Sequence, residues 1–466
     1  MIATNSPTAP GLHSLSAPER PAQPKPAAAP FRPLLSGSWL AAQGRLPLAF
    51  MGLALSWLAI GAGMIVIAPR VLTMPHFAPS VVALAHAWVL GFFVTVAVGA
   101  IYQIAPVALG TTLANERYGW WHFWLHAGGV PGMVYSFWIW DMKLLGHFGT
   151  FVALGIVLFV ANTWRTVRRA PHRGAVAWSI ALAAGWLLLT VLAGLVLSAN
   201  RFWHFIPLDP LSLLRAHAHA GLVGFFVTLL QGVSFQLLPM FTLGEVRDWK
   251  LVKTGLWLSQ IGLLGLVAAL VGNAGYVAAG CATVIVAGML VSAVALKRAL
   301  ATRKKRALDP GVCAFLGGSA VLIGAGFMAV ALAWPSNGWS SAPGGFNAMV
   351  YAVVLVIGGL LPSIAGMMCK VVPFLTWMRA YGPKVGRVPT PAAGALTNPK
   401  LEWAAFALQV SATVPLAVGV WLLNPTWLTV GAWVLAAGTA LFLADMIGVM
   451  KHLSWPSSPE VRGRTN

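Results

Sequence analysis

The amino-acid sequence predicts an all-α integral membrane protein with twelve transmembrane helices, arranged as three pseudo-symmetric four-helix repeats. The composition, a series of long apolar runs and a recurring segment predict this fold. Hydrophobic residues make up 58% of the 466 residues and charged residues only 9%, whereas a soluble domain has about 25% charged residues. Water is therefore not the main solvent of this chain, and we expect a lipid bilayer to surround it.

Long apolar runs divide the chain into candidate spans. About 20 apolar residues cross the hydrocarbon core as a helix, which satisfies its own backbone hydrogen bonds there. The predicted spans are 47–69, 81–108, 120–140, 145–163, 176–198, 213–241, 252–272, 274–296, 312–333, 346–377, 402–423 and 427–450.

These spans define a membrane domain at 47–450, with repeats at about 47–163, 176–296 and 312–450. The Ala- and Pro-rich residues 1–46 have the composition of a disordered cytoplasmic tail. Residues 451–466 are expected to form a cytoplasmic C-terminal tail.

The positive charges support this topology. A net charge of +20 is also typical of nucleic-acid-binding proteins, but here Lys and Arg lie in short loops between apolar runs. That pattern is typical of membrane orientation, so we expect no nucleic-acid partner. With the N-terminus inside, 25 of the 30 Lys and Arg fall on the cytoplasmic side and Lys370 lies within a span. The four outside are Arg70, Lys143, Arg201 and Arg215. The sequence thus predicts a multi-pass protein of a bacterial inner (cytoplasmic) membrane, with both termini in the cytoplasm.

A 21-residue segment recurs along the chain. Residues 86–106 and 219–239 are offset by 133 without a gap, and ten positions are identical. A third copy lies 267 residues beyond the first and keeps two glycines and the proline, but Val353 replaces His86 there. The copies fall in the second, sixth and tenth spans. The repeat unit is therefore four spans, and we expect the three spans to face a common interior.

Histidines at matching positions are the first candidates for a functional site. His86 lies near the outer face in the second span, and His219 takes the equivalent place in the sixth. His217 is two residues from His219, about 200° around a helix, so these two are not expected to share one ion. Imidazole binds haem iron and copper. A haem or metal site is therefore predicted, with hydrogen bonding between helices as the alternative. Three further histidines lie in or beside outer loops: His76, His147 and His204.

A second histidine pair lies near the cytoplasmic side. His122 and His126 are four residues apart, which places both on one helix face. Three tryptophans surround them: Trp120, Trp121 and Trp124. An aromatic belt at the membrane interface is the favoured interpretation, and a second metal site or a proton relay is the alternative.

Lys370 occupies the position that Gln103 and Gln236 occupy in the other two copies. Its ammonium could extend to the cytoplasmic interface, or it could bind an anion, a haem propionate or a proton. The two glutamines are expected to form hydrogen bonds between helices. Together the three residues are candidates for an ion or proton path.

Three segments carry a resemblance to a known family: LAHAWVLGFFVTVAVGAIYQIAPVALG, RAHAHAGLVGFFVTLLQGVSFQLLPMF and GMMCKVVPFLTWMRAYGPKVG. With the three four-helix units, they resemble subunit I of the haem–copper oxidases, as a short, divergent oxidase subunit I-like branch. The chain is also distantly similar to the NnrS-type haem- and copper-containing membrane proteins linked to nitric-oxide stress. The resemblance covers about residues 47–450 and implies haem b and copper as cofactors.

Departures from the family limit what the resemblance implies. Oxidases of this superfamily carry two histidines in the tenth span and two adjacent histidines in the seventh. Here Val353 stands at the repeat position, and neither the tenth span nor residues 251–271 contain histidine. His86 matches the haem ligand of the second span, and His217 or His219 falls in the span that supplies a copper ligand.

The resulting prediction is a haem-binding oxidase-like membrane protein, with copper as a further candidate, that lacks the full binuclear centre. Its role would be electron transfer or redox chemistry of nitric oxide or oxygen, with an electron donor or other membrane subunits as partners. Whether it is itself a degenerate haem–copper oxidoreductase stays open. The alternative is a cofactor-free transporter or assembly factor on the same scaffold.

Overall fold

The protein is described by a computed structural model that covers residues 1–2, 44–335 and 346–454. Within these ranges the secondary structure is helical, without β-strands. The predicted disordered tail at 1–46 lies mostly outside the described residues, and so do residues 455–466 of the predicted C-terminal tail. The first helix begins at Arg45, two residues before the predicted start of the membrane domain.

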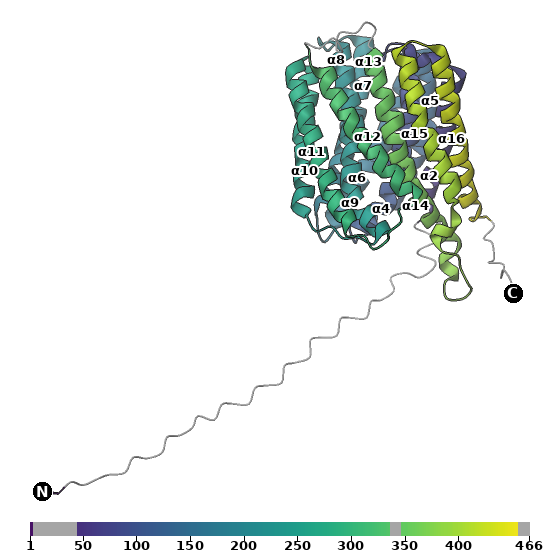
Figure 1. The fold of residues 1–466 in the computed structure, drawn as a ribbon. Coiled ribbons are helices and arrows are strands. Elements are labelled where there is room, and N and C mark those ends of the chain that lie inside the picture. The colour runs from purple at the N-terminus through teal and green to yellow at the C-terminus, as the bar shows by residue number, and fades with distance from the viewer. Residues whose placement is uncertain (3–43, 336–345, 455–466) are drawn as a thin grey trace. The chain divides into compact units, whose positions relative to one another are not determined.

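The long helices are joined by short loops and by 3₁₀- and π-helical segments (Figure 1). The first half comprises α2 (Arg45–Ile67), η1 (Pro69–Thr73), α3 (Pro79–His86), η2 (Ala87–Val94), α4 (Thr95–Ala108), α5 (Glu116–Ile139), α6 (Met142–Arg169), α7 (Ala175–Trp203), α8 (Pro210–His219), η3 (Ala220–Val227) and α9 (Thr228–Thr242). The second half comprises α10 (Trp249–Val271), α11 (Gly275–Ala301), α12 (Pro310–Ala333), α13 (Phe346–Val353), η5 (Val354–Leu360), α14 (Leu361–Ala380), η6 (Gly382–Lys384), η7 (Ala393–Leu396), α15 (Pro399–Trp421) and α16 (Pro425–Lys451).

Eleven helices in the described residues are long and apolar enough to cross a membrane. They overlap eleven of the predicted spans. The remaining predicted span, 120–140, overlaps α5, a 24-residue helix that is not among the eleven. Its sequence, ERYGWWHFWLHAGGVPGMVYSFWI, is rich in glycine and in aromatic residues with polar groups, which lowers its hydropathy. The helix packs along α6.

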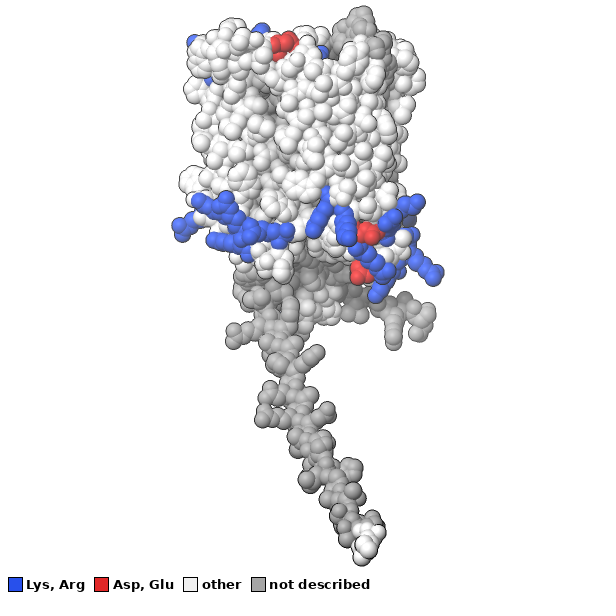
Figure 2. All heavy atoms as spheres, turned by 90° about the vertical axis from the view of Figure 1, so that its left-hand side faces the viewer, with Lys and Arg blue, Asp and Glu red and all other residues white. Residues whose placement is uncertain are grey.

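The two ends of the helix bundle differ in charge. We call the end with α8 and α13 the histidine end, and the end with α4, α9 and α14 the basic end (Figure 1). Figure 2 shows Lys and Arg gathered on the basic end of the face in view, with few at the histidine end. The ion pairs Arg298–Asp248 and Lys305–Asp309 lie at helix ends and in a loop at the basic end.

Three helices contain a π-helical segment at matching positions. The segments η2, η3 and η5 begin at Ala87, Ala220 and Val354. These positions are offset by 133 and 267 residues, as in the recurring sequence segment. A π turn bonds residue i to i+5, so it widens the helix and frees backbone carbonyls, and such turns are frequent at functional sites. In η2 the freed carbonyl of Leu90 accepts a hydrogen bond from Thr95 Oγ1 at 2.9 Å.

Glycines of the repeated segment let neighbouring helices approach closely. A Cβ atom on Gly91 would lie 2.4 Å from the Trp57 ring of α2, and one on Gly224 would lie 2.7 Å from the Trp186 ring of α7. No side chain fits at such distances without displacing the indole. The glycines therefore act in the packing of neighbouring helices.

Candidate functional site

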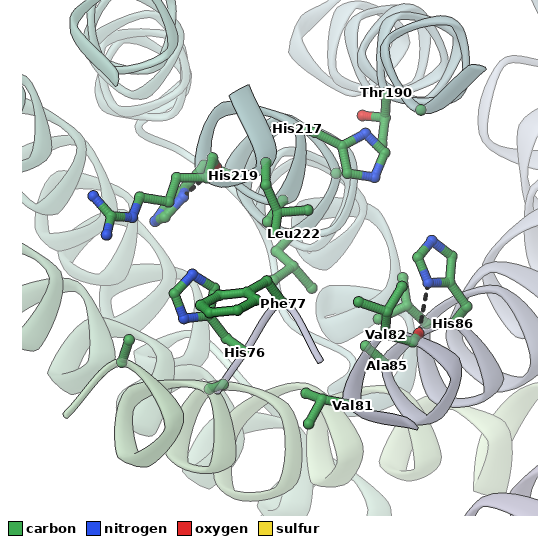
Figure 3. A pocket seen from close by; sticks show the side chains of 18 of the residues that line it. His76, Phe77, Val81, Val82, Ala85, His86, Thr190, His217, His219 and Leu222 are labelled. Carbon is green, nitrogen blue, oxygen red and sulfur yellow. Dashed lines mark hydrogen bonds between the residues drawn. The ribbon is translucent and has the colours of Figure 1, made fainter. Parts of the chain in front are cut away.

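The four histidines His76, His86, His217 and His219 line one cavity of about 820 Å³ at the histidine end. Roughly 300–1,000 Å³ is usual for ligand and cofactor pockets. The walls are formed mainly by apolar residues of the helices that carry η2, η3 and η5, together with α7. Figure 3 shows His86 and His217 on one side of the cavity and His76 and His219 on the other. Arg201 and Arg215 also line it.

His86 is held in a defined orientation at the end of α3. Its Nδ1 lies 2.8 Å from the carbonyl oxygen of Val82, one turn earlier. Because a carbonyl only accepts hydrogen bonds, Nδ1 carries the proton and the lone pair of the neutral ring lies on Nε2. The ring stacks on Phe137 of α5 at a centroid distance of 4.5 Å. Metal-binding histidines are commonly oriented by such a bond to a carbonyl.

His219 repeats this geometry in α8. Its Nδ1 lies 2.8 Å from the carbonyl of Arg215, the residue that corresponds to Val82. The ring lies 6.1 Å from that of Tyr351 in α13, and the two planes are inclined by 11°. The match in sequence between His86 and His219 is therefore also a match in local hydrogen bonding.

His217 faces His86, away from His219. Its ring centroid lies 6.5 Å from that of His86, with 24° between the planes. Its Nδ1 is buried without a hydrogen-bond partner. Gly194 of α7 leaves room for the ring, since a Cβ there would lie 3.1 Å from His217 Cε1. The rings of His217 and His219 thus contact different neighbours, as their spacing predicted.

His76 lies in the loop between η1 and α3, and both of its ring nitrogens are buried without a partner. Burial, and then the positive charge of Arg215, lower its pKa below the usual 6.5. The ring is therefore neutral near pH 7. Of the other outer-loop histidines, His147 and His204 are exposed and do not line the cavity. His147 bonds the Lys143 carbonyl at 2.8 Å through Nδ1, as His86 bonds Val82.

The interpretation of His122 and His126 as part of an interfacial belt is wrong, since both side chains are fully buried. His122 Nδ1 lies 2.9 Å from the Tyr102 hydroxyl. His126 Nε2 lies 2.8 Å from Thr95 Oγ1 and 3.3 Å from the Leu90 carbonyl, the oxygen freed by η2. His126 therefore stabilises a π turn, which periodicity in the sequence could not reveal.

Lys370 forms an ion pair with Asp309 at the start of α12. Burial alone would raise the pKa of Asp309, but hydrogen bonds from Lys305 and Lys370 outweigh it and lower this pKa below 3.8. The ion pair favours the interpretation that the Lys370 ammonium extends to the interface over the one in which it binds a free anion. The described residues that line the cavity do not include Lys370, Gln103 or Gln236.

Sequence reasoning missed two glutamines that correspond to His126. Gln260 of α10 donates to Thr228 Oγ1 at 2.7 Å and accepts from Trp186 Nε1 at 2.8 Å. Thr228 follows η3 as Thr95 follows η2. Gln409 of α15 is fully buried, and both polar atoms of its amide lack a partner. The signal available in the sequence was a polar residue within the predicted third, seventh and eleventh spans, namely His126, Gln260 and Gln409.

Within the described ranges, no group of three or more His, Cys, Asp or Glu side chains is placed to hold one metal ion. The cavity histidines are instead distributed as the His86–His217 pair, His219 and His76. This donor set suits a ligand that takes two imidazoles, such as a haem iron, better than a three-histidine copper centre.

The comparisons with known proteins identify the fold. The chain is similar to one in a cryo-EM structure of a haem–copper terminal oxidase dimer, with a TM-score of 0.60 and 13% sequence identity. The alignment covers 92% of this chain and 85% of that one. No protein-family model matches the sequence, and no curated protein matches it. The protein is thus a multi-pass membrane protein with the fold of a haem–copper terminal oxidase chain.

Proposed function

We propose that this chain is a haem-binding, oxidase subunit I-like membrane protein in which His86 and His217 hold a b-type haem. The observation that carries the proposal is the facing pair of rings, 6.5 Å apart between centroids. Two imidazole nitrogens on one metal ion lie roughly 4 Å apart, and the ring centroids lie farther out. The observed separation would therefore allow both imidazoles to hold one iron.

The surroundings fit a haem. The cavity of about 820 Å³ has mostly apolar walls, which suit a porphyrin, and Arg201 and Arg215 suit its carboxylates. The Val82 carbonyl orients His86, and Gly194 leaves space for the ring of His217. A bound haem would supply one-electron transfer. The chain's own part is to orient two imidazoles and keep the cavity apolar.

His219 and His76 are the candidate ligands for copper in the same cavity. His219 carries its proton on Nδ1, so its Nε2 has a lone pair for a metal, and both nitrogens of His76 are unpartnered. Imidazole is a suitable ligand for copper. The described residues supply no third His, Cys, Asp or Glu ligand there.

We infer a role in electron transfer, or in redox chemistry of nitric oxide or oxygen, without a full binuclear centre. α10 contains no histidine, and Val353 stands where a third in-register histidine would be. The predicted relation to NnrS-type proteins belongs to this proposal and rests on the sequence resemblance alone.

We also propose the finer topology: twelve spans in three four-helix repeats, with both termini in the cytoplasm of a bacterial inner membrane. The three π segments in register support the repeats. The gathering of Lys and Arg at one end supports the orientation, with the basic end inside (Figure 2). The lipid bilayer is then the first partner, and an electron-donating protein or other membrane subunit the second.

The test is an absorption spectrum of the detergent-purified protein, oxidised and then reduced, with haem and copper determined on the same sample. A b-type spectrum is expected in the wild type. It should be lost or strongly altered in His86→Ala and His217→Ala. If the wild type contains copper, His219→Ala should lower its copper content and leave the haem spectrum unchanged.

The matched control is His147→Ala, because His147 bonds the carbonyl one turn earlier as His86 does but is exposed and outside the cavity. This variant should keep the wild-type spectrum. Folded protein without haem, from cells with ample haem and copper, would overturn the proposal in favour of a cofactor-free transporter or assembly factor. A spectrum unchanged in both His86→Ala and His217→Ala would refute the assigned ligands.

A further inference from the structure

Buried polar atoms without a hydrogen-bond partner concentrate in α14, α15 and α16. Seven of the fifteen such side-chain atoms in the described residues belong to these helices. They belong to Thr376, Glu402, Gln409, Thr413, Thr439 and Asp445. An unpaired polar group in an apolar environment costs several kcal/mol, and native proteins usually satisfy such groups, with ordered water where no side chain serves. Their concentration in one region indicates water inside this part of the bundle.

Gln409 shows why its partner is missing. His126 and Gln260, in the other two repeats, each bond the threonine hydroxyl that follows a π segment. After η5 that position is Pro362, which has no hydroxyl or N–H. The amide of Gln409 therefore keeps its donors and its acceptor buried without a partner among the described residues, so water is the available partner.

Two carboxyl groups lie at the basic end of the same region. Glu402 of α15 is 2% exposed and Asp445 of α16 is 4% exposed. Asp445 Oδ1 accepts a hydrogen bond from the Asn398 N–H at 2.8 Å, but its Oδ2 and Glu402 Oε1 have no partner. Glu402 lies within electrostatic range of Asp445 and beside Cys369 and Thr397. Two ionised carboxylates with free oxygens in such a site would repel each other strongly.

The charges around this pair leave it short of one positive charge. Lys370 faces the pair from α14 but is held by Asp309, which also binds Lys305. Two ammonium groups thus stand against three carboxyl groups. One proton, or one monovalent cation, would restore the balance.

The orphaned groups lead from the pair toward the cavity. Glu402, Gln409 and Thr413 are spaced by seven and four residues, so they share one face of α15 over about 16 Å. Thr413 packs against Gly358 of η5, where an added Cβ would lie 3.0 Å from its Cγ2. The neighbouring residue Ile357, and Leu416 one turn beyond Thr413, line the cavity.

We propose that Glu402 and Asp445 share one proton, and that Gln409 and Thr413 hold a file of water that passes it to the histidine cavity. A proton fits better than a metal cation, because only two free carboxylate oxygens are available where a hard cation requires about six ligands. One O–H bond breaks at the carboxyl as one forms on the adjacent water, and the pair regains a proton from the basic end. No electron moves in these steps. The destination of the file rests on the proposed function, whereas the shared proton does not.

The first test is infrared spectroscopy of the purified full-length protein at neutral pH, in H₂O and D₂O. A C=O stretch of a protonated carboxylic acid that shifts in D₂O is expected in the wild type. It should disappear in Glu402→Gln or in Asp445→Asn, which preserve side-chain size. The matched control is Glu245→Gln, since Glu245 is an exposed carboxylate paired with Arg247 and should leave the band unchanged.

A spectrum without this band, or a band that survives both variants, would overturn the shared proton. Loss of the band on adding Na⁺ would also overturn it and identify a cation site instead. The infrared measurement does not require haem. A protein that binds no cofactor would therefore refute the proposed function, while the shared proton could still be tested.

The second test addresses the water file in haem-loaded protein. Proton uptake on rapid reduction is followed with a pH-indicator dye. Gln409→Leu should slow uptake by at least about tenfold, while the infrared band of the acid pair stays in place. Gln231→Leu is the control, since Gln231 is a glutamine of α9 that bonds Ser259 at 3.0 Å. Equal uptake rates in wild type and Gln409→Leu would exclude the file as the route.

Discussion

At the scale of single residues, in-register histidines were predictable but their partners were not. The equivalence of His86 and His219 follows from the sequence, and both rings bond the carbonyl one turn earlier. The partner of His126 did not follow, because it is a carbonyl freed by a π turn that hydrophobic periodicity does not reveal. The pairing of His86 with His217 likewise depends on how α3 and α8 lie relative to each other.

The ion pair of Asp309 predicts a defined pH dependence. The pKa of Asp309 is lowered, so its contribution to stability is present above its ordinary pKa of 3.8 and is lost as the pH falls through the lowered value. Asp309→Asn should therefore lower the melting temperature at pH 7, and the difference from wild type should shrink below about pH 4. Solvent screening limits the effect to about 1 kcal/mol or less.

Thermal unfolding in detergent across this pH range provides the measurement. Glu245→Gln removes an ion pair with 72% and 67% exposed side chains and should change little at any pH. A difference for Asp309→Asn that grows toward low pH would contradict the assigned direction of the pKa.

At the scale of elements, the spans were predictable because a bilayer requires long apolar helices, whereas the π segments inside them were not. The recurring GFFVT sequence reads equally well as α-helix. What distinguishes the segments are contacts from other helices: His126 reaches η2, and Gln260 reaches the threonine after η3. Local structure here depends on tertiary partners that lie 31 and 32 residues away in the chain.

The threonine after η2 should therefore matter more than an ordinary helical threonine. Thr95→Val removes the donor to the Leu90 carbonyl and the hydroxyl beside His126 Nε2. Because both partners stay buried, we expect a loss of about 1–3 kcal/mol in unfolding free energy. Thermal and denaturant unfolding of the purified protein measure this loss.

Thr150→Val is the matched control. Its hydroxyl donates to the Gly146 carbonyl, four residues earlier, at 2.7 Å, but the side chain is exposed on α6. Comparable stability of the two variants would show that the threonine after η2 has no special part in holding the π turn.

At the scale of the whole molecule, the distribution of Lys and Arg predicts which end faces the cytoplasm. His204→Cys, at the histidine end, should react with a membrane-impermeant maleimide in cells whose outer membrane is permeabilised and whose inner membrane is intact. Lys304→Cys, in the loop after α11, should react only after the inner membrane is opened. Both native positions are exposed.

The reverse labelling pattern would invert the topology and place the cavity on the cytoplasmic side. The unsubstituted protein, with its three native cysteines, serves as the background control. The apolar composition made the membrane fold predictable from sequence, but the cavity was not, because it forms where residues from many helices far apart in the sequence meet.

Because His217 and His219 both lie on α8, the positions of their rings are coupled through that helix. The two rings leave opposite sides of one rigid element, one toward His86 and the other toward Tyr351. A small rotation of α8 that advances one ring withdraws the other. A ligand bound to His217 and a ligand bound to His219 would then favour opposite rotations of α8, without direct contact between them. By reciprocity, each would weaken the other's binding by the same factor.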